Sequence, residues 1–163
     1  MSSNFSLFKK HSGNSFAFRM FLLTQVPAAF FAGVKLEKLE MEEAAVTASY
    51  KWFNKNPFRS VYFAVLLMAG EISTGILCMA YLYKRNPGVS MLLIQNESNF
   101  YKKATGKIIF TCTDGKLINE AADKAAASGE ATTVRCRSVG KNEQEETVAE
   151  LYFTWSFKTR KKA

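Results

Sequence analysis

The sequence predicts an α+β fold in which a curved antiparallel sheet of about six strands wraps around one long central helix. The stretch from about Phe58 to Tyr83 is almost continuously apolar, as expected of a helix that is buried on nearly every face. Other stretches alternate apolar and polar residues, which is typical of strands with one buried face. A helix that is apolar all round needs cover on most sides, and a sheet gives it only by curling around the helix.

An N-terminal helical segment, residues 1–30, precedes the sheet. Basic residues come before the apolar text "FAFRMFLLTQVPAAFFAG", as in a secretion signal, but Arg19 and Gln25 interrupt the apolar run and no clean cleavage site follows. We therefore expect an amphipathic helix that ends before Pro27. Two strands follow in residues 34–39 and 46–50, and the chain turns between them.

Turn-forming residues mark both ends of the central helix. The text "NKNP" stops the second strand, and Pro57 suits the first turn of a helix. The text "KRNPG" ends the helix after Tyr83. Beyond it we expect a hairpin that turns at Thr105–Gly106, an alanine-rich helical or loop excursion, and a second hairpin that turns near residues 140–145.

Length and composition favour one domain, residues 1–163, with a basic tail in residues 159–163. The 48% apolar content is enough for a core. The three cysteines lack CxxC spacing, so we expect buried small hydrophobes in a reducing cytoplasm, and neither a disulfide framework nor a zinc site. The single histidine, His11, argues against a histidine base in the fold. The net charge of +8 favours anionic partners, which could be a nucleic acid, an anionic membrane or a phosphate-bearing ligand.

The central helix is also long enough to cross a bilayer, and Arg59, Lys84 and Arg85 flank it. Against a membrane span, Glu71 would lie near the bilayer centre at a cost of about 2.5–3.5 kcal/mol. The alternating strands elsewhere in the chain also need an apolar partner to cover them. We therefore expect a core helix and no membrane span.

The stretch "NPFRSVYFAVLLMAGE" resembles the hot-dog fold thioesterases, in particular their phenylacetate-pathway-like branch. That branch has an asparagine, a His-Gly-Gly step six residues later, and an acid nine residues after the histidine. Here Asn56, Tyr62 and Glu71 have the same spacing. Tyr62, Phe63 and Ala64 stand in place of His-Gly-Gly. The text "NESNFYKKATGKIIFTCT" is similar to the family's hairpin, and the order of strands agrees, so the chain is identified as an uncharacterised relative of these enzymes.

The resemblance implies a site as well as a fold. In the family, a carboxylate on the helix attacks the thioester or activates a water, and backbone amides at the helix start hold the oxyanion. Glu71 would be that carboxylate and the amide of Phe63 the oxyanion donor. Asn56 would orient the water or the substrate carbonyl, and Tyr62 would replace the histidine as a hydrogen-bond donor. Because Tyr62 and Glu71 lie on opposite sides of one helix, a site with both draws on two subunits, as the family's dimers imply.

Other residues are candidates for substrate binding: Ala64, Met68, Thr74 and Gly75 on the helix, and Arg135 and Arg137 on a strand. Thr74 and Gly75 share the helix face of Glu71, and an apolar patch with one hydroxyl should raise the pKa of that acid. A structural hydrogen bond to Thr74 or to a backbone amide, or exposure, is the alternative for Glu71. The two arginines could meet the phosphates of coenzyme A or simply face solvent.

Two hypotheses follow. The first is a cytoplasmic acyl-CoA thioesterase, a hydrolase that acts as a homodimer or tetramer, with coenzyme A only as part of the substrate and with no metal. The second is a non-catalytic hot-dog module that binds an acyl or aromatic ligand in the same tunnel. Aromatic residues in the last strand suit single-stranded nucleic acid or a core equally well, and we expect no nucleic-acid partner.

Overall fold

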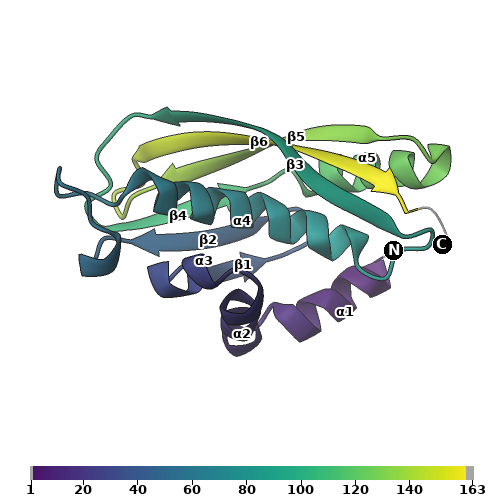
Figure 1. Cartoon of the computed structure of the whole chain (residues 1–163), viewed down its shortest axis with the longest axis horizontal. Helices are drawn as coiled ribbons and strands as arrows, with labels where there is room; N and C mark the ends of the chain where they lie inside the picture. Colours follow the sequence, from purple (N-terminus) through teal and green to yellow (C-terminus); the bar gives the residue numbers. More distant parts are fainter. Residues whose placement is uncertain (1, 161–163) are drawn as a thin grey trace.

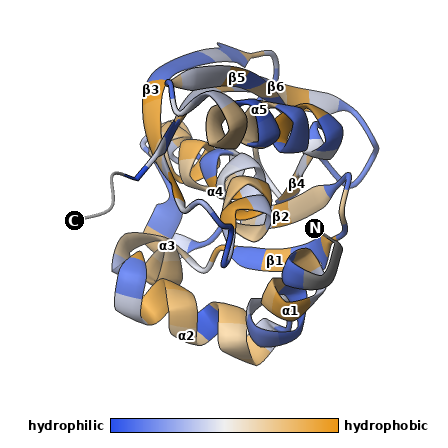
Figure 2. Cartoon of the chain, turned by 90° about the vertical axis from the view of Figure 1, so that its right-hand side faces the viewer, coloured by the Kyte–Doolittle hydropathy of each residue, from blue (hydrophilic) through white to orange (hydrophobic). Residues whose placement is uncertain are grey.

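The computed structural model describes residues 2–160 and confirms the predicted architecture. The strands are β1 (Lys35–Leu39), β2 (Ala44–Ser49), β3 (Val89–Phe100), β4 (Lys107–Cys112), β5 (Thr132–Lys141) and β6 (Thr147–Thr159). The α-helices are α1 (Ser2–Ser12), α2 (Ser15–Gln25), α3 (Pro27–Ala32), α4 (Phe63–Leu82) and α5 (Gly115–Ser128), and a 3₁₀ turn, η1, covers Trp52–Asn54. One antiparallel sheet, in the order β1-β2-β4-β5-β6-β3, curls around α4, as the end-on view in Figure 2 shows.

The core lies between the inner face of the sheet and α4, which runs along the length of the molecule (Figure 1). Gly70 allows close contact, since a Cβ there would lie 2.4 Å from Leu151 Cδ1 of β6. A buried hydrogen bond joins the hydroxyls of Ser73 on α4 and Ser138 on β5 (2.7 Å). α4 is apolar enough to cross a bilayer, but 67% of its most apolar window is buried inside the protein. Its surroundings are those of a core helix.

The predicted hairpin at Thr105–Gly106 is wrong. β3 pairs with β6 at one edge of the sheet, whereas β4 pairs with β2 and β5 in its middle. Residues 101–106 therefore cross from the edge to the middle, and Val61 donates a backbone hydrogen bond to Ala104 in this crossing (N–O 2.8 Å). The pairing of β1 with β2 and of β5 with β6 is as predicted. Alternation identifies strands, but it does not identify their neighbours.

The central helix begins at Phe63 rather than near Phe58. The side-chain oxygen of Asn56 accepts hydrogen bonds from the backbone N–H groups of Phe58 and Ser60 (3.0 and 3.1 Å). Such a side chain-to-backbone turn competes with helical hydrogen bonding. Arg59, in the same turn, has a φ of +59°, which no α-helix contains. Residues 56–62 therefore form a loop before the helix.

The N-terminal segment is helical, as predicted, but contains three helices rather than one. Asn14 separates the first two, because its side chain accepts a hydrogen bond from the Ala17 N–H and so caps α2 (2.8 Å). Pro27 opens α3, where its missing N–H is tolerated. The alanine-rich excursion is a full helix, α5. The expected basic tail starts at Thr159, still in β6, and residues 161–163 lie outside the described residues.

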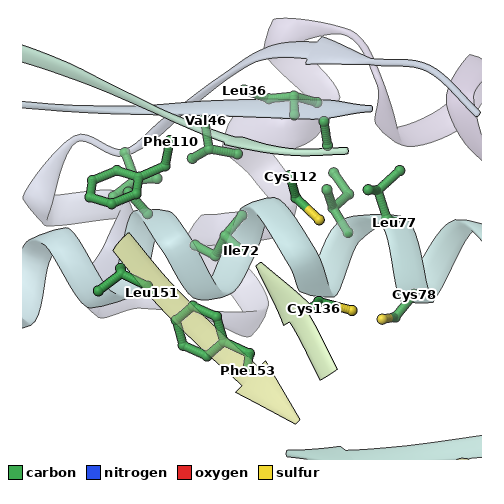
Figure 3. Packing of buried hydrophobic residues seen from close by; sticks show 14 of the residues in the cluster. Leu36, Val46, Ile72, Leu77, Cys78, Phe110, Cys112, Cys136, Leu151 and Phe153 are labelled. Atoms are coloured by element: carbon green, nitrogen blue, oxygen red, sulfur yellow. The ribbon is translucent and has the colours of Figure 1, made fainter. Parts of the chain in front are cut away.

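All three cysteines are free and buried, which confirms their prediction as small hydrophobes. Figure 3 shows the sulfurs of Cys78 on α4 and Cys136 on β5 pointing toward each other. A hydrogen bond with Cys136, together with burial, raises the pKa of the Cys112 thiol. Since nucleophilic cysteines are thiolates in accessible sites, none of the three fits that role.

Candidate active site

A groove of about 330 Å³ lies between the first half of α4 and the edge strand β3. Residues from three elements line it: Ala64, Leu67, Met68 and Glu71 of α4, Leu93 and Asn96 of β3, and Phe153 of β6. The α4 residues follow the i, i+3, i+4, i+7 spacing of one helix face. The sheet leaves this face half-buried, whereas Val65 and Leu66 beside it are buried. The groove therefore has apolar walls and one carboxylate.

The Glu71 carboxylate is desolvated and without a partner. Burial raises the pKa of Glu71, and within residues 2–160 neither a hydrogen bond nor an ion pair reaches its carboxylate oxygens. The structural alternative of a bond to Thr74 is absent, because the Thr74 hydroxyl donates to the backbone carbonyl of Glu71 (2.9 Å) and accepts from Trp155 Nε1 (3.0 Å). A desolvated acid without a compensating partner is unfavourable for stability and is typical of reactive sites.

Thr74 and Gly75 support the carboxylate but do not line the groove. Both are buried inside the helix–sheet contact. A Cβ at Gly75 would lie 3.2 Å from Glu71 Oε1 and 3.3 Å from Trp155 Cζ2. The glycine therefore gives the carboxylate room to lie along the next turn of α4. Met68 and Ala64, two of the residues proposed from sequence to bind substrate, line the groove.

Asn56, Tyr62 and Phe63 lie at the start of α4, on a second cavity of about 650 Å³. The side chain of Asn56 is fully used in its own loop: besides accepting from two backbone amides, it donates to Ser60 Oγ (3.0 Å) and to the Val61 carbonyl oxygen (3.4 Å). It therefore positions the loop and the first turn of α4. Tyr62 is the N-cap residue, and its ring is about half exposed. The amides of Phe63 and Ala64 are among the first of the helix, so no carbonyl four residues earlier in the helix accepts from them.

Within one protomer, Glu71 and the Phe63 amide are not close. They are eight residues apart in α4, which corresponds to about 12 Å along the axis at 1.5 Å per residue. A carboxylate and an oxyanion donor that act on one carbonyl must both lie within about 3–4 Å of it. The two groups of a single chain therefore cannot serve the same reacting carbon.

The structure does not bring Arg135 or Arg137 to Glu71. Both alternate along β5 with inward-facing residues, so they lie on the outer face of the sheet. Arg135 forms an ion pair with Glu97 (3.1 Å) and stacks over a tyrosine ring, and Arg137 forms an ion pair with Glu150. Their charges are already compensated, which agrees with the alternative of a sheet face turned toward solvent.

Comparisons with known proteins agree with this architecture. No protein-family model and no curated protein matches the chain. Solved structures do match: a probable thioesterase of unknown function from Pseudomonas aeruginosa is 19% identical, with 88% of this chain and 95% of that chain covered and a TM-score of 0.74. A putative thioesterase from Shewanella oneidensis is 11% identical, with 98% and 100% covered and a TM-score of 0.69. A thioesterase from Haemophilus influenzae is 12% identical, with 86% and 88% covered and a TM-score of 0.60.

The chain has the hot-dog fold. Its long helix is the one that carries Glu71, and its strand order leaves β3 free at one edge. At 11–19% identity these structures share the fold with this hot-dog chain, so its function must be argued from its own site.

Sequence analysis of this hot-dog chain missed the β3 and β6 side of the groove, Leu93, Asn96 and Phe153, because nothing local shows that β3 passes beside the first half of α4. It also missed Lys102 and Lys103, which line the second cavity. The adjacent aromatic and basic residues in "NFYKKAT" were the available signal for that cavity.

Proposed function

We propose that this hot-dog protein is an acyl-CoA thioesterase in which Glu71 is the catalytic carboxylate. The observation that carries the proposal is the Glu71 side chain, which is half-buried, lines an apolar groove and has no hydrogen-bond or ion-pair partner for its carboxylate within residues 2–160. A general base works best when its pKa approaches the working pH, and burial moves that of Glu71 in this direction. The thioesterase descriptions of structures with the same fold support the choice of reaction.

In the proposed reaction, Glu71 takes a proton from a water molecule, and the water oxygen attacks the thioester carbonyl carbon. The carbonyl electron pair moves onto oxygen, where the amide of Phe63 donates a hydrogen bond to the oxyanion, with the Ala64 amide next to it. Collapse of the tetrahedral intermediate breaks the C–S bond. The proton held by Glu71 passes to the departing sulfur, so the products are a carboxylic acid and coenzyme A.

A second copy of the chain completes the site in this proposal. Since 12 Å separates Glu71 from Phe63 along one helix, at about 1.5 Å per residue, the amide comes from the partner protomer. β3 is suited to hold that partner: its 12 residues contain neither lysine nor proline, and Leu92 and Ile94 are 66% and 52% exposed. A long apolar edge strand is a template for pairing. Two β3 strands paired antiparallel across a two-fold axis place the two α4 helices side by side in opposite directions.

The groove then holds the acyl or aryl group, since its walls are apolar apart from Glu71 and Asn96. We place the reaction in the cytoplasm, where the three free thiols stay reduced. Tetramer formation from two such dimers is a further prediction.

The test is release of the coenzyme A thiol from a panel of short, long and aryl acyl-CoAs. We expect turnover by the wild type on at least one class and its loss in Glu71→Gln. Turnover that is indifferent to this substitution would exclude the proposed role of Glu71.

A binding module without catalysis is the second candidate. The observation in its favour is the Phe63 ring, 49% exposed beside the oxyanion amide, where it takes space that the family's glycine leaves free. In that case no acyl-CoA is hydrolysed, but an acyl ligand raises the melting temperature of the protein.

A further inference from the structure

The larger cavity, at the start of α4, has two walls that are tied together. Residues 56–58 and 60–63 form one wall together with Leu66, and residues 100–104, where the chain leaves β3, form the other. The backbone hydrogen bond from Val61 to Ala104 links them (2.8 Å). The cavity measures about 650 Å³, within the usual range of about 300–1,000 Å³ for small-molecule sites. Five aromatic rings and two lysines lie in its lining: Phe58, Tyr62, Phe63, Phe100, Tyr101, Lys102 and Lys103.

Several aromatic residues of the cavity lining are exposed. Phe58 is 71% exposed and Tyr101 is 56% exposed. Phe63 meets both Tyr62 (centroids 5.0 Å apart, planes at 72°) and Phe100 (6.4 Å, 85°) edge to face. In an edge-to-face pair, the ring that contributes its edge is not covered by the other ring on either of its faces. These faces can take a planar ring by stacking.

The charge of the cavity is positive. Lys102 is held by Glu146 (2.5 Å), whereas within residues 2–160 no carboxylate is in ion-pair distance of Lys103. Among the residues that the structure describes, none of those lining the cavity is acidic. The start of α4, a helix of 20 residues, adds free amides and the positive end of the helix dipole beside Phe63. The groove beside Glu71 differs, because its lining, as far as residues 2–160 are concerned, contains no lysine or arginine.

We propose that this cavity binds the 3′-phosphorylated adenine nucleotide of coenzyme A, with the adenine stacked on the aromatic wall and the phosphates at Lys103. This inference rests on the proposed function. Within an acyl-CoA, only the nucleotide joins a planar ring to phosphates, and this cavity offers both aromatic rings and a lysine without an ion-pair partner among residues 2–160. Tyr62 and Phe63, which replace His-Gly of the family motif, then form part of the nucleotide wall. With tyrosine and phenylalanine in place of histidine and glycine, this wall has a larger aromatic surface on which the nucleotide can stack.

The first test measures the dissociation constant of 3′-phosphoadenosine 5′-phosphate by calorimetry at low ionic strength. We expect Phe58→Ala to raise it about fivefold or more, the effect of losing one stacking contact. Lys103→Ser should raise it about three- to tenfold, and the difference should shrink in high salt. Phe16→Ala and Lys124→Ser are the matched controls: their side chains are also exposed, lie outside the cavity and should change nothing. Because Phe58 and Lys103 are exposed, melting curves should show that both variants remain folded.

A second measurement separates this inference from the proposed function. Lys103→Ser should raise KM for an acyl-CoA but not for the N-acetylcysteamine thioester of the same acid, which has no nucleotide. Equal KM changes for both substrates, or no binding of the nucleotide, would overturn the nucleotide site while hydrolysis stands. Nucleotide binding that depends on Phe58 and Lys103 without any thioester turnover would keep the site and overturn the hydrolase. Equal affinity for AMP would show a general adenine-nucleotide site and overturn the assignment to coenzyme A.

Discussion

Glu71 and Glu150 are two carboxylates in opposite situations. Glu150, on the outer face of β6, accepts a hydrogen bond from the Tyr101 hydroxyl (3.0 Å) and pairs with Arg137, and these contacts lower its pKa. Glu71, on the groove side of α4, has neither kind of contact within residues 2–160, and burial raises its pKa. Glu97 and Glu150 on the outer face form ion pairs with arginines, whereas the carboxylate of Glu71 in the groove has no such partner within residues 2–160. That difference is the reason for proposing Glu71 as the catalytic carboxylate.

The largest expected effect is a difference in activity between variants that lack one or the other of these two acids. Glu71→Gln keeps the size of the side chain but cannot accept a proton, so we expect kcat/KM for the best acyl-CoA to fall about 10²- to 10⁴-fold. Glu150→Gln is the matched control, and its loss of surface contacts should change kcat/KM less than about threefold. Steady-state thiol release measures both. Similar losses in the two variants would remove the functional distinction.

The next effect tests whether the groove, unlike the outer face, is completed by a second copy. Ile94 lies near the middle of β3, so Ile94→Lys places two like charges close together in a symmetric β3–β3 pair. We expect elution as a monomer and at least about a tenfold fall in kcat/KM, since the oxyanion amide is then missing. Thr133→Lys on β5, exposed and away from the sheet edge, is the control. A fully active Ile94→Lys monomer would contradict the shared site.

A smaller effect comes from the position of the carboxylate in the groove. Gly75→Ala puts a Cβ 3.2 Å from Glu71 Oε1 and should move that oxygen. We expect kcat to fall about tenfold, because small displacements of a reacting group are costly for rate. Stability should change little, since alanine favours a helix by about 1 kcal/mol over glycine and offsets part of the crowding. Unchanged kcat would show that Glu71 needs no fixed position.

The smallest effect is on stability against pH. An acid whose pKa is raised in the folded state holds more protons there than in the unfolded chain, so its contribution to stability falls as pH rises from about 4.5 through the folded pKa. Glu71→Gln removes this loss and should be more stable than wild type at pH 8, with the gap closing below pH 4.5. Glu150→Gln should be less stable at pH 8, because the pKa of Glu150 is lowered. Urea unfolding at a series of pH values measures the free energy of unfolding of both variants. Stability changes in the same direction for both variants at pH 8 would contradict the comparison.

Much of the fold could be predicted because the pattern of apolar residues carries it. The uninterrupted apolar run of α4 and the alternation of the six strands both report which faces are buried. The start of α4 and the neighbours of β3 could not be predicted in the same way. The start depends on hydrogen bonds from the Asn56 side chain, and the position of β3 depends on its contact with β6, far away in sequence.

The candidate site, like the fold, could be predicted from the sequence only in part. Glu71 stands out in sequence because an acid in an apolar helix is costly, and the structure leaves it unpaired. Thr74 shares its helix face by spacing, but the direction of its hydroxyl depends on Trp155, which no spacing reveals. Alternation alone left two interpretations for Arg135 and Arg137, and it could not reveal that both form ion pairs on the outer face with acids of β3 and β6. Side-chain partners from distant strands are what sequence patterns omit.

The most direct test of the contrast between the two acids is a ¹³C NMR titration of the Glu71 carboxyl carbon in the folded protein, assigned with Glu71→Gln. The account predicts a pKa above the ordinary value of about 4.5, on the opposite side from Glu150, and an acid limb of kcat/KM at the same pH. A Glu71 that titrates at or below 4.5 would contradict it, because the carboxylate would then be solvated or paired like those on the outer face.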